Sequence, residues 1–166
     1  GREQHGKTGS RGREFAIRET GPRFLVNLDA YLDTGLFLDH RALRALVRER
    51  AAGRRMLNLF PYTGSFTVYA AAGGALRSDT VDLSNTYLDW AARNFALNGM
   101  DLARHVLIRA DVLEWLDKVA PLLEGWTTPS ARLYAEAEHR LERLGAWRVA
   151  KQGQAGQVYF HLLERE

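Results

Sequence analysis

The sequence contains no cysteine, no long apolar run and only five histidines, and each shortage excludes a class of protein. Without cysteine, the chain can form no disulfide framework, no zinc site built on thiolates and no cysteine nucleophile. The histidines form no His-x-x-x-His pair, so no metal signature is present. No stretch approaches the roughly eighteen apolar residues of a membrane helix, and residues 1–5 lack the apolar segment of a secretory signal. We therefore expect a cytoplasmic protein without a metal or a membrane partner.

The composition is that of a soluble globular chain, but its charges are unevenly placed. Of the 166 residues, 46% are hydrophobic and 26% are charged, which is sufficient for a substantial core. Residues 1–23 carry six basic side chains against three acidic ones, and the segment Arg41–Arg55 carries six arginines and one glutamate. Such basic segments are typical of a surface that contacts nucleic-acid phosphates. A flexible arm and a solvated helix face have the same composition and remain the alternative.

The N-terminal third is predicted to contain an arm, a hairpin, a loop and a helix. Residues 1–13 have almost no apolar side chain, which favours a flexible basic arm. Polar and apolar residues alternate over 14–19 and 23–28 around a Gly-Pro turn, which predicts a β-hairpin. The segment 29–41 is too irregular for a strand and is interpreted as a structured loop. Apolar residues at helical spacing between arginines predict a helix over 42–52, with Leu43, Leu46 and Val47 as its apolar positions.

Strands and helices are predicted to alternate in the middle of the chain. The three strands are expected at 56–60, 80–83 and 106–109, and the helices at 66–72, 85–97 and about 112–119. Ser84 is expected to cap the second of these helices, and Asn98-Gly99 to end it. Three strands each followed by a helix are half of a doubly wound parallel sheet. After residue 121 the alternation ends, and the sequence predicts a helix over 130–144 and a hairpin of strands 147–151 and 157–163.

Three residues that follow consecutive predicted strands suggest a nucleotide site. The Gly-x-Gly-x-x-Gly and Walker patterns are absent, and the first turn contains the single glycine Gly64. Asp82 ends the second strand, where a carboxylate can accept both hydroxyl protons of a ribose, and Asp111 follows the third strand. Taken singly, Gly64 fits a turn residue and each aspartate a helix cap. Because open α/β sheets bind ligands at the carboxyl ends of their strands, the three together predict an adenosine-containing ligand.

Four segments of the sequence narrow the prediction from a fold class to a protein family. They are VNLDAYLDTGLFLDHR (26–41), LNLFPYTGSFTVYAAAGGA (57–75), TVDLSNTYLDWAARNFALNGM (80–100) and HVLIRADVLEWL (105–116). Together they resemble the catalytic domain of the large-subunit ribosomal RNA guanine methyltransferase K/L family, over roughly residues 3–118. The resemblance implies a class I methyltransferase fold, S-adenosylmethionine as cofactor and a guanine of ribosomal RNA as substrate.

The resemblance also implies roles for individual residues. Those that match the family's first cofactor loop, around the methionine part of the ligand, are Asn58, Phe60, Tyr62, Thr63 and Gly64. Those that match its nucleoside contacts are Asp82 for the ribose, Leu83 beside the adenine, and Asp111 with Val112 at the adenine edge. Those in a segment similar to a lid over the cofactor are Phe37, Asp39 and Arg41. Substrate RNA would be held by Arg2, Lys7, Arg11, Arg13 and the segment Arg41–Arg55.

The sequence departs from the family after the third strand. Its four prolines are never adjacent, so the family's Asp-Pro-Pro element beside the target base is absent. Residues 115–129 are too few to hold the fourth strand, its helix and the fifth strand, and the tail from Leu122 does not match. A shortened relative, part of a longer protein, or a tail that replaces the missing strands would each explain this. No catalytic residue is assigned.

The expected fold is therefore α/β: a shortened Rossmann-like class I methyltransferase sheet with an N-terminal β-hairpin and a C-terminal helix plus β-hairpin. A single domain, 14–166, follows the arm 1–13; its parts are the hairpin, lid loop and helix (14–55), the cofactor-binding half (56–120) and the tail (121–166). The predicted function is S-adenosylmethionine-dependent RNA methylation. The alternatives are a non-catalytic module that binds the cofactor or RNA, and a Rossmann-type dinucleotide oxidoreductase, against which the single glycine of the first turn counts.

Overall fold

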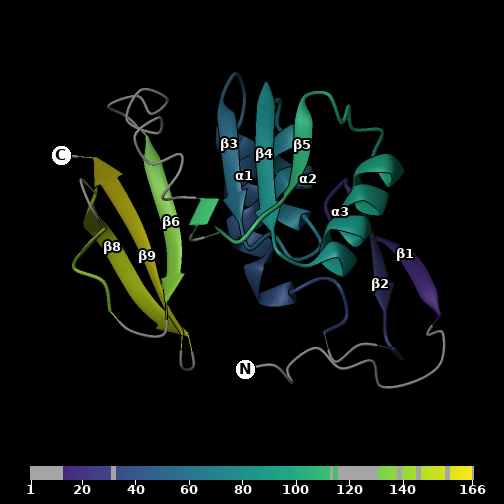
Figure 1. The fold of residues 1–166 in the computed structure, drawn as a ribbon, viewed down its shortest axis with the longest axis horizontal. Coiled ribbons are helices and arrows are strands. Elements are labelled where there is room, and N and C mark those ends of the chain that lie inside the picture. The colour runs from purple at the N-terminus through teal and green to yellow at the C-terminus, as the bar shows by residue number, and fades with distance from the viewer. Residues whose placement is uncertain are drawn as a thin grey trace. The chain divides into compact units, whose positions relative to one another are not determined.

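The computed structural model describes residues 13–30, 33–112, 114–115, 131–137, 140–144, 147–155 and 158–165. It separates into two units, Gly1–Trp115 and Leu116–Glu166 (Figure 1). The predicted arm up to residue 12, and most of the helix predicted at 112–119, lie outside the described residues. Within the described part of the chain, no helix is long and apolar enough to cross a membrane.

The first unit begins with the predicted hairpin. Strands β1 (Glu14–Arg18) and β2 (Arg23–Asn27) pair antiparallel, which confirms the expectation. The connection is tight: Thr20 has φ 45° and Gly21 has φ 119°, both left-handed backbone conformations. The Glu19 amide donates to the Pro22 carbonyl over 2.9 Å and closes the turn.

A parallel sheet with its connecting helices follows, as predicted. The elements are η1 (Leu38–His40), α1 (Arg41–Arg50), β3 (Arg55–Leu59), α2 (Ser65–Ala72), β4 (Arg77–Asp82), α3 (Asn85–Leu97) and β5 (His105–Arg109). The strands pair in the order β3-β4-β5, all parallel. The bounds of α3 are the predicted ones, because Ser84 accepts a hydrogen bond from the Tyr87 amide and Gly99, with φ 65°, ends the helix.

The core of this unit lies between the sheet and the helices. Helix α2 packs on β3 and β4, while α3 packs on β4, β5 and β2, and α1 packs on α2. Figure 1 shows α1 and α2 on one side of the parallel sheet. The central buried residues are Phe24, Val68, Tyr69, Ala91 and Phe95. Helices α1 and α2 approach so closely at Gly73 that a Cβ there would overlap the Arg48 main chain, so glycine is required at this position.

The second unit is an antiparallel sheet, and here one prediction was wrong. Its strands are β6 (Arg132–Ala137), β7 (Arg143–Leu144), β8 (Trp147–Ala155) and β9 (Val158–Arg165), in the order β6-β9-β8-β7. The predicted hairpin is confirmed as β8 and β9. The helix predicted over 130–144 is instead β6 and β7, because a four-residue apolar spacing fits two strand periods as well as one helical turn. Pairing of β6 with β9 along its whole length selects the strand.

Asn94 of α3 and Asn98, which directly follows that helix, both bind the backbone of β2, and the structure predicts different costs for their loss. Asn94 is fully buried; it accepts from the Leu25 amide over 2.8 Å and donates to the Thr63 carbonyl over 2.9 Å. Asn94→Ala should lower the free energy of unfolding by about 2–5 kcal/mol, because the buried Thr63 carbonyl and the half-buried Leu25 amide both lose their partner. Denaturant unfolding measures this loss.

The matched control is Asn98→Ala, one helical turn further on. Asn98 makes an equivalent pair of bonds with the Arg23 amide and carbonyl, over 2.8 and 2.7 Å, at the surface. Since water can replace these bonds, we expect a loss of about 0.5–1.5 kcal/mol. Equal losses for the two variants would contradict the assignment of Asn94 as a buried bridge.

Candidate functional site

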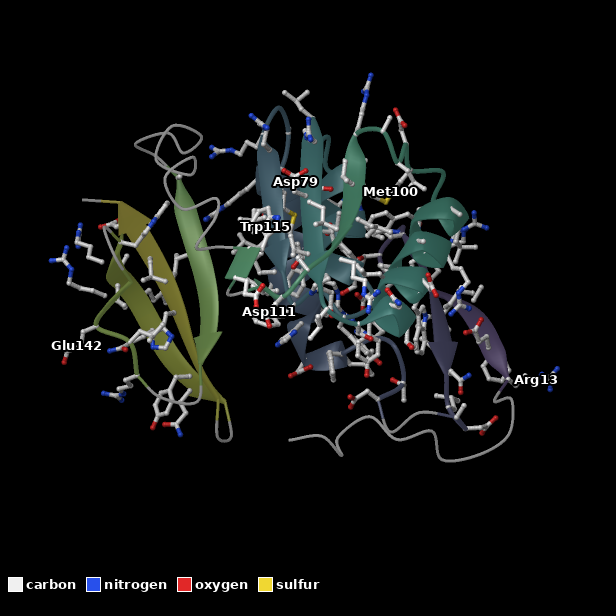
Figure 2. All side chains as sticks on the ribbon, viewed as in Figure 1. Arg13, Asp79, Met100, Asp111, Trp115 and Glu142 are labelled. Atoms are coloured by element: carbon white, nitrogen blue, oxygen red, sulfur yellow. The ribbon has the colours of Figure 1, made fainter. Side chains whose placement is uncertain are left out.

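The carboxyl ends of the three parallel strands lie side by side and are joined by hydrogen bonds. The Phe60 amide donates to the Val81 carbonyl over 3.2 Å, and the Ala110 amide donates to the Asp82 carbonyl over 3.0 Å. Figure 2 shows Asp111 at this edge of the sheet and Met100, which precedes β5, toward the opposite edge. The residues that follow β3, β4 and β5 therefore meet at one edge, as in open α/β sheets that bind ligands.

The turn after β3 is strained. Phe60 and Tyr62, on either side of Pro61, have φ 56° and 53°, and Gly64 has φ 73°. Left-handed backbone costs a non-glycine residue about 1–2 kcal/mol, and such residues cluster at functional sites. Phe60 is also 70% exposed. The turn thus holds an aromatic ring in solvent in an unfavourable backbone conformation, which is typical of a ligand-binding loop.

Gly64 is required by the packing beneath this turn. A Cβ at Gly64 would lie 2.8 Å from Cε1 of Phe95 and 3.0 Å from the Cβ of Ala91, both on α3. The absent side chain therefore allows the turn to rest on α3. Gly64 therefore has the structural role of a turn residue, which the sequence analysis gave as the alternative to a ligand role. Its close packing on α3 fixes the position of the turn that follows β3.

The predicted lid loop is hydrogen-bonded to the same turn. The Thr63 hydroxyl donates to the Gly35 carbonyl over 2.6 Å, and the Tyr62 hydroxyl donates to the Asp33 carbonyl over 2.9 Å. The rings of Phe37 and Tyr62 have centroids 5.1 Å apart. Three of the predicted site residues, Phe37, Tyr62 and Thr63, are thereby brought together from segments more than twenty residues apart.

Helix α3 adds aromatic residues that the sequence analysis missed. The centroid of the Tyr62 ring lies 4.7 Å from that of Tyr87 and 6.1 Å from that of Trp90. Trp90 also donates from Nε1 to the Leu25 carbonyl over 3.1 Å. The sequence could have indicated Tyr87, because this residue lies in the first turn of the helix that follows Asp82. The first turn of that helix lies next to the carboxyl edge of the sheet.

Both aspartates of the predicted site accept hydrogen bonds from backbone amides that follow them in the chain. Asp82 Oδ1 accepts from the Ser84 amide over 2.8 Å, and Asp111 Oδ1 accepts from the Glu114 amide over 3.1 Å. These bonds are the structural alternative to a ligand role, and they also orient each carboxylate at the end of its strand. Beside the aspartates, Leu83 is 59% exposed, whereas Val112 is buried.

Two other predicted residues form hydrogen bonds within the protein, and a third is exposed. The Asn58 amide donates to Thr67 Oγ1 over 3.0 Å, and Thr67 is hydrogen-bonded to Thr80, so Asn58 belongs to a buried chain between the sheet and α2. Arg41 donates from Nε to Glu19 Oε2 over 3.0 Å. Asp39 is exposed, 4.0 Å from Nε2 of its neighbour His40. The side chains of Asn58 and Arg41 are thus already used within the protein.

A buried ion pair lies next to the lid loop. Arg44 is fully buried and donates from Nε and Nη2 to the two carboxylate oxygens of Glu19, over 2.9 and 3.1 Å. Burial raises the pKa of Glu19, but hydrogen bonds from Arg41 and Arg44 outweigh it and hold the pKa below its usual value. The stabilisation is therefore present at neutral pH and is lost as the pH falls through that lowered value.

The arginines of the segment Arg41–Arg55 do not share one surface. Arg44 is buried, which corrects the prediction that the whole segment contacts RNA. Of the apolar positions predicted for this helix, Leu46 is exposed. Arg54 and Arg55 precede or begin β3 and so lie at the amino edge of the sheet. Among the described residues, no group of three or more histidine, aspartate or glutamate side chains could hold a metal ion.

The parallel sheet and its connecting helices define a Rossmann-like fold of the methyltransferase class. The crystal structure of SMU.776, described as a methyltransferase and complexed with S-adenosylhomocysteine (SAH), superimposes with a TM-score of 0.75 at 20% sequence identity, over 94% of this chain and 57% of that one. A sequence model of the S-adenosylmethionine-dependent methyltransferase family matches residues 7–123. The chain belongs to this family.

Curated relatives are close in sequence over the same region. The chain is 66% identical, over 116 residues, to ribosomal RNA large subunit methyltransferase K of Neisseria meningitidis serogroup B, a match that covers 70% of this chain and 33% of the relative. It is 54% identical, over 120 residues, to ribosomal RNA large subunit methyltransferase K/L of Allochromatium vinosum, covering 72% of this chain and 16% of the relative. These matches confirm the resemblance. The chain spans a third or less of the length of either relative.

The role of Gly64 can be separated from its backbone conformation by two alanine substitutions. Gly99 has nearly the same φ, 65°, with no atom within 4 Å of its missing Cβ. Gly99→Ala should cost only the left-handed conformation, about 1–2 kcal/mol of the free energy of unfolding. Gly64→Ala should cost about 2–5 kcal/mol, because overlap with Phe95 is added. Chemical denaturation checks both values, and equal costs would mean that the turn does not rest on α3.

Proposed function

We propose that this chain binds S-adenosylmethionine at the carboxyl edge of β3, β4 and β5 and methylates RNA, with a guanine of large-subunit ribosomal RNA as the substrate. The observation that carries this proposal is the convergence of the strained turn Phe60–Gly64 with Asp82 and Asp111 at the ends of three consecutive parallel strands. Membership of the methyltransferase family and the names of the curated relatives support it.

The residues at this edge suit the parts of the cofactor. The Asp82 carboxylate suits ribose hydroxyls, and the exposed side chain of Leu83 offers an apolar surface to adenine. Asp111, with the backbone at Val112, suits the polar edge of adenine. The neighbouring rings of Phe37 and Tyr62 suit the positively charged sulfonium of the cofactor. Cation–π attraction between an aromatic ring and such a cation contributes about 0.5–2 kcal/mol. Asp39, exposed in the same loop, suits the methionine ammonium.

The bound cofactor would supply a methyl group on a good leaving group, so the protein needs chiefly to align the reactants and exclude water. The lid loop and the first turn, joined through Thr63 and Gly35, form a wall that can do both. A guanine N7 needs no general base, whereas an exocyclic amine needs a proton acceptor nearby. We assign no residue to that acceptor.

RNA would be bound by exposed arginines, one of which lies at the same edge of the sheet. Arg109 ends β5 at the carboxyl edge and is exposed, which suits a phosphate contact beside the site. Arg13 is exposed next to β1, and it continues the basic arm whose other members, Arg2, Lys7 and Arg11, lie outside the described residues. The target base would be single-stranded or extruded from its stack to reach the cofactor.

A second candidate is a module that binds the cofactor or RNA without catalysis. Among the described strands, β3 is the last on its side of the parallel sheet and pairs only with β4. Open α/β sheets bind ligands where the strand order reverses, which requires a strand on the other side of the first one. The absence of adjacent prolines, and hence of the Asp-Pro-Pro element, also favours this candidate.

Calorimetric titration with SAH tests the cofactor site. Asp82→Ala should weaken SAH binding by about 1–3 kcal/mol, the cost of losing charge-assisted hydrogen bonds. The matched control is Asp101→Ala: Asp101 Oδ1 accepts from the amide two residues on, at Ala103, over 2.9 Å, as Asp82 does from Ser84, but at the amino edge of the sheet. Its affinity should equal that of the wild type. Unchanged affinity in Asp82→Ala would remove Asp82 from the site.

Transfer of a labelled methyl group into unmodified large-subunit ribosomal RNA tests the activity. We expect incorporation by the wild-type chain, and a severalfold higher KM for RNA in Arg109→Gln with kcat unchanged, because one phosphate contact is lost. Arg104→Gln, an exposed arginine just before β5 at the amino edge, serves as the control and should behave as the wild type. SAH binding without any incorporation would instead favour the non-catalytic module.

A further inference from the structure

The carboxylate of Glu19 lies inside the protein and joins three elements. Glu19 is 5% exposed, in the turn between β1 and β2. It accepts hydrogen bonds from Arg41 and Arg44 of α1, and Tyr69 of α2 lies with its hydroxyl 3.0 Å from Oε1 and 2.8 Å from the Glu19 carbonyl. At 5% exposure this carboxylate is not a ligand for a molecule in solvent.

Two of these contacts continue into the lid loop. Arg44 uses its remaining nitrogen, Nη1, to donate to the Phe37 carbonyl over 2.8 Å. Arg41 is the residue that directly follows η1, and Phe37 is the residue that directly precedes it. The same carboxylate therefore anchors both ends of the segment 37–41, one end directly and the other through Arg44.

Besides these anchors, the segment is held by ring contacts of Phe37 with Tyr62 and of His40 with Phe66, with centroids 5.1 and 5.8 Å apart. None of the residues of η1 is buried, and its N-cap residue makes no side-chain capping bond. Leu38 is 62% exposed, so the segment gains little from apolar burial. With so little buried surface, this short helix depends strongly on the polar contacts at its two ends, and Glu19 takes part in both, directly at Arg41 and through Arg44 at Phe37.

We infer that Glu19 is a positioning residue for cofactor binding: through Arg41 and Arg44 it holds the segment 37–41 against the turn Phe60–Gly64, and so sets the affinity for S-adenosylmethionine without touching it. This inference rests on the proposed function, because it assumes that Phe37 and Asp39 face the cofactor. Apparent affinity falls by the fraction of molecules in which a binding segment is correctly placed.

Glu19→Gln tests the inference, since glutamine keeps the shape of the side chain but loses the charge that both arginines share. If the segment 37–41 is correctly placed a tenth of the time in this variant, the Kd for SAH rises about tenfold. Hydrogen exchange of a peptide containing residues 38–41, measured without ligand, should become faster in Glu19→Gln. Both measurements are made well below the midpoint of thermal unfolding of each variant.

Arg48→Lys is the matched control. Arg48 lies one turn beyond Arg44 on α1 and binds the same β1–β2 turn, donating from Nη1 to the Thr20 carbonyl over 2.8 Å. Substitution of Arg48 by lysine weakens the contact between the β1–β2 turn and α1, but it leaves both anchors of the segment 37–41 in place. We expect the SAH affinity and the exchange of residues 38–41 to equal those of the wild type.

Should Glu19→Gln fail to fold, Arg44→Lys replaces it, because lysine keeps a cation for Glu19 but cannot also reach the Phe37 carbonyl as the guanidinium fork does. Unchanged SAH affinity in a folded Glu19→Gln or Arg44→Lys would overturn the inference, as would an equal loss of affinity in Arg48→Lys. A wild-type chain that binds no SAH would overturn the proposed function itself. A wild type that binds SAH normally beside an unaffected variant would overturn only the positioning role.

Discussion

A buried carboxylate is the constraint around which the N-terminal half of the structure is arranged. A charge removed from water must be compensated by partners with good geometry, and loss of one partner leaves the other uncompensated. Glu19 meets this requirement only when the β1–β2 turn, α1 and α2 occupy their observed places, because each contributes a contact. The same requirement extends to the Phe37 carbonyl through Arg44. Hairpin, helices and lid loop are thereby coupled in one arrangement.

In the candidate site, residues of the proposed cofactor pocket also have structural roles. Hydrogen bonds from the following backbone amides hold the carboxylates of Asp82 and Asp111 at the ends of β4 and β5, where parallel connectivity also places the turn after β3. Gly64 brings that turn down on α3, and the left-handed backbone at Phe60 and Tyr62 is the local cost. A structural role for each of Gly64, Asp82 and Asp111 is therefore compatible with the proposal that the three together bind a ligand.

Prediction from the sequence succeeded where the determining interactions are local. Helix α3 has the predicted bounds because Ser84 and Gly99 act within one turn of it. The prediction failed for β6, whose apolar spacing fits helix and strand alike until β9 pairs with it. It also failed to identify Arg44 as buried, because arginine is buried only where a partner is supplied, and Glu19 lies 25 residues away in the chain.

The sequence by itself determined the family, the order of strands and helices from β1 to β5, and the residues that follow each parallel strand, because these depend on local spacing and on specific motifs. Only the tertiary structure decided which of those residues meet. It joined the lid loop to the turn at Thr63, turned Asn58 into the interior, and buried Glu19 with Arg44. The physical reason is that buried polar groups must be paired, and their partners come from parts of the chain that only folding brings together.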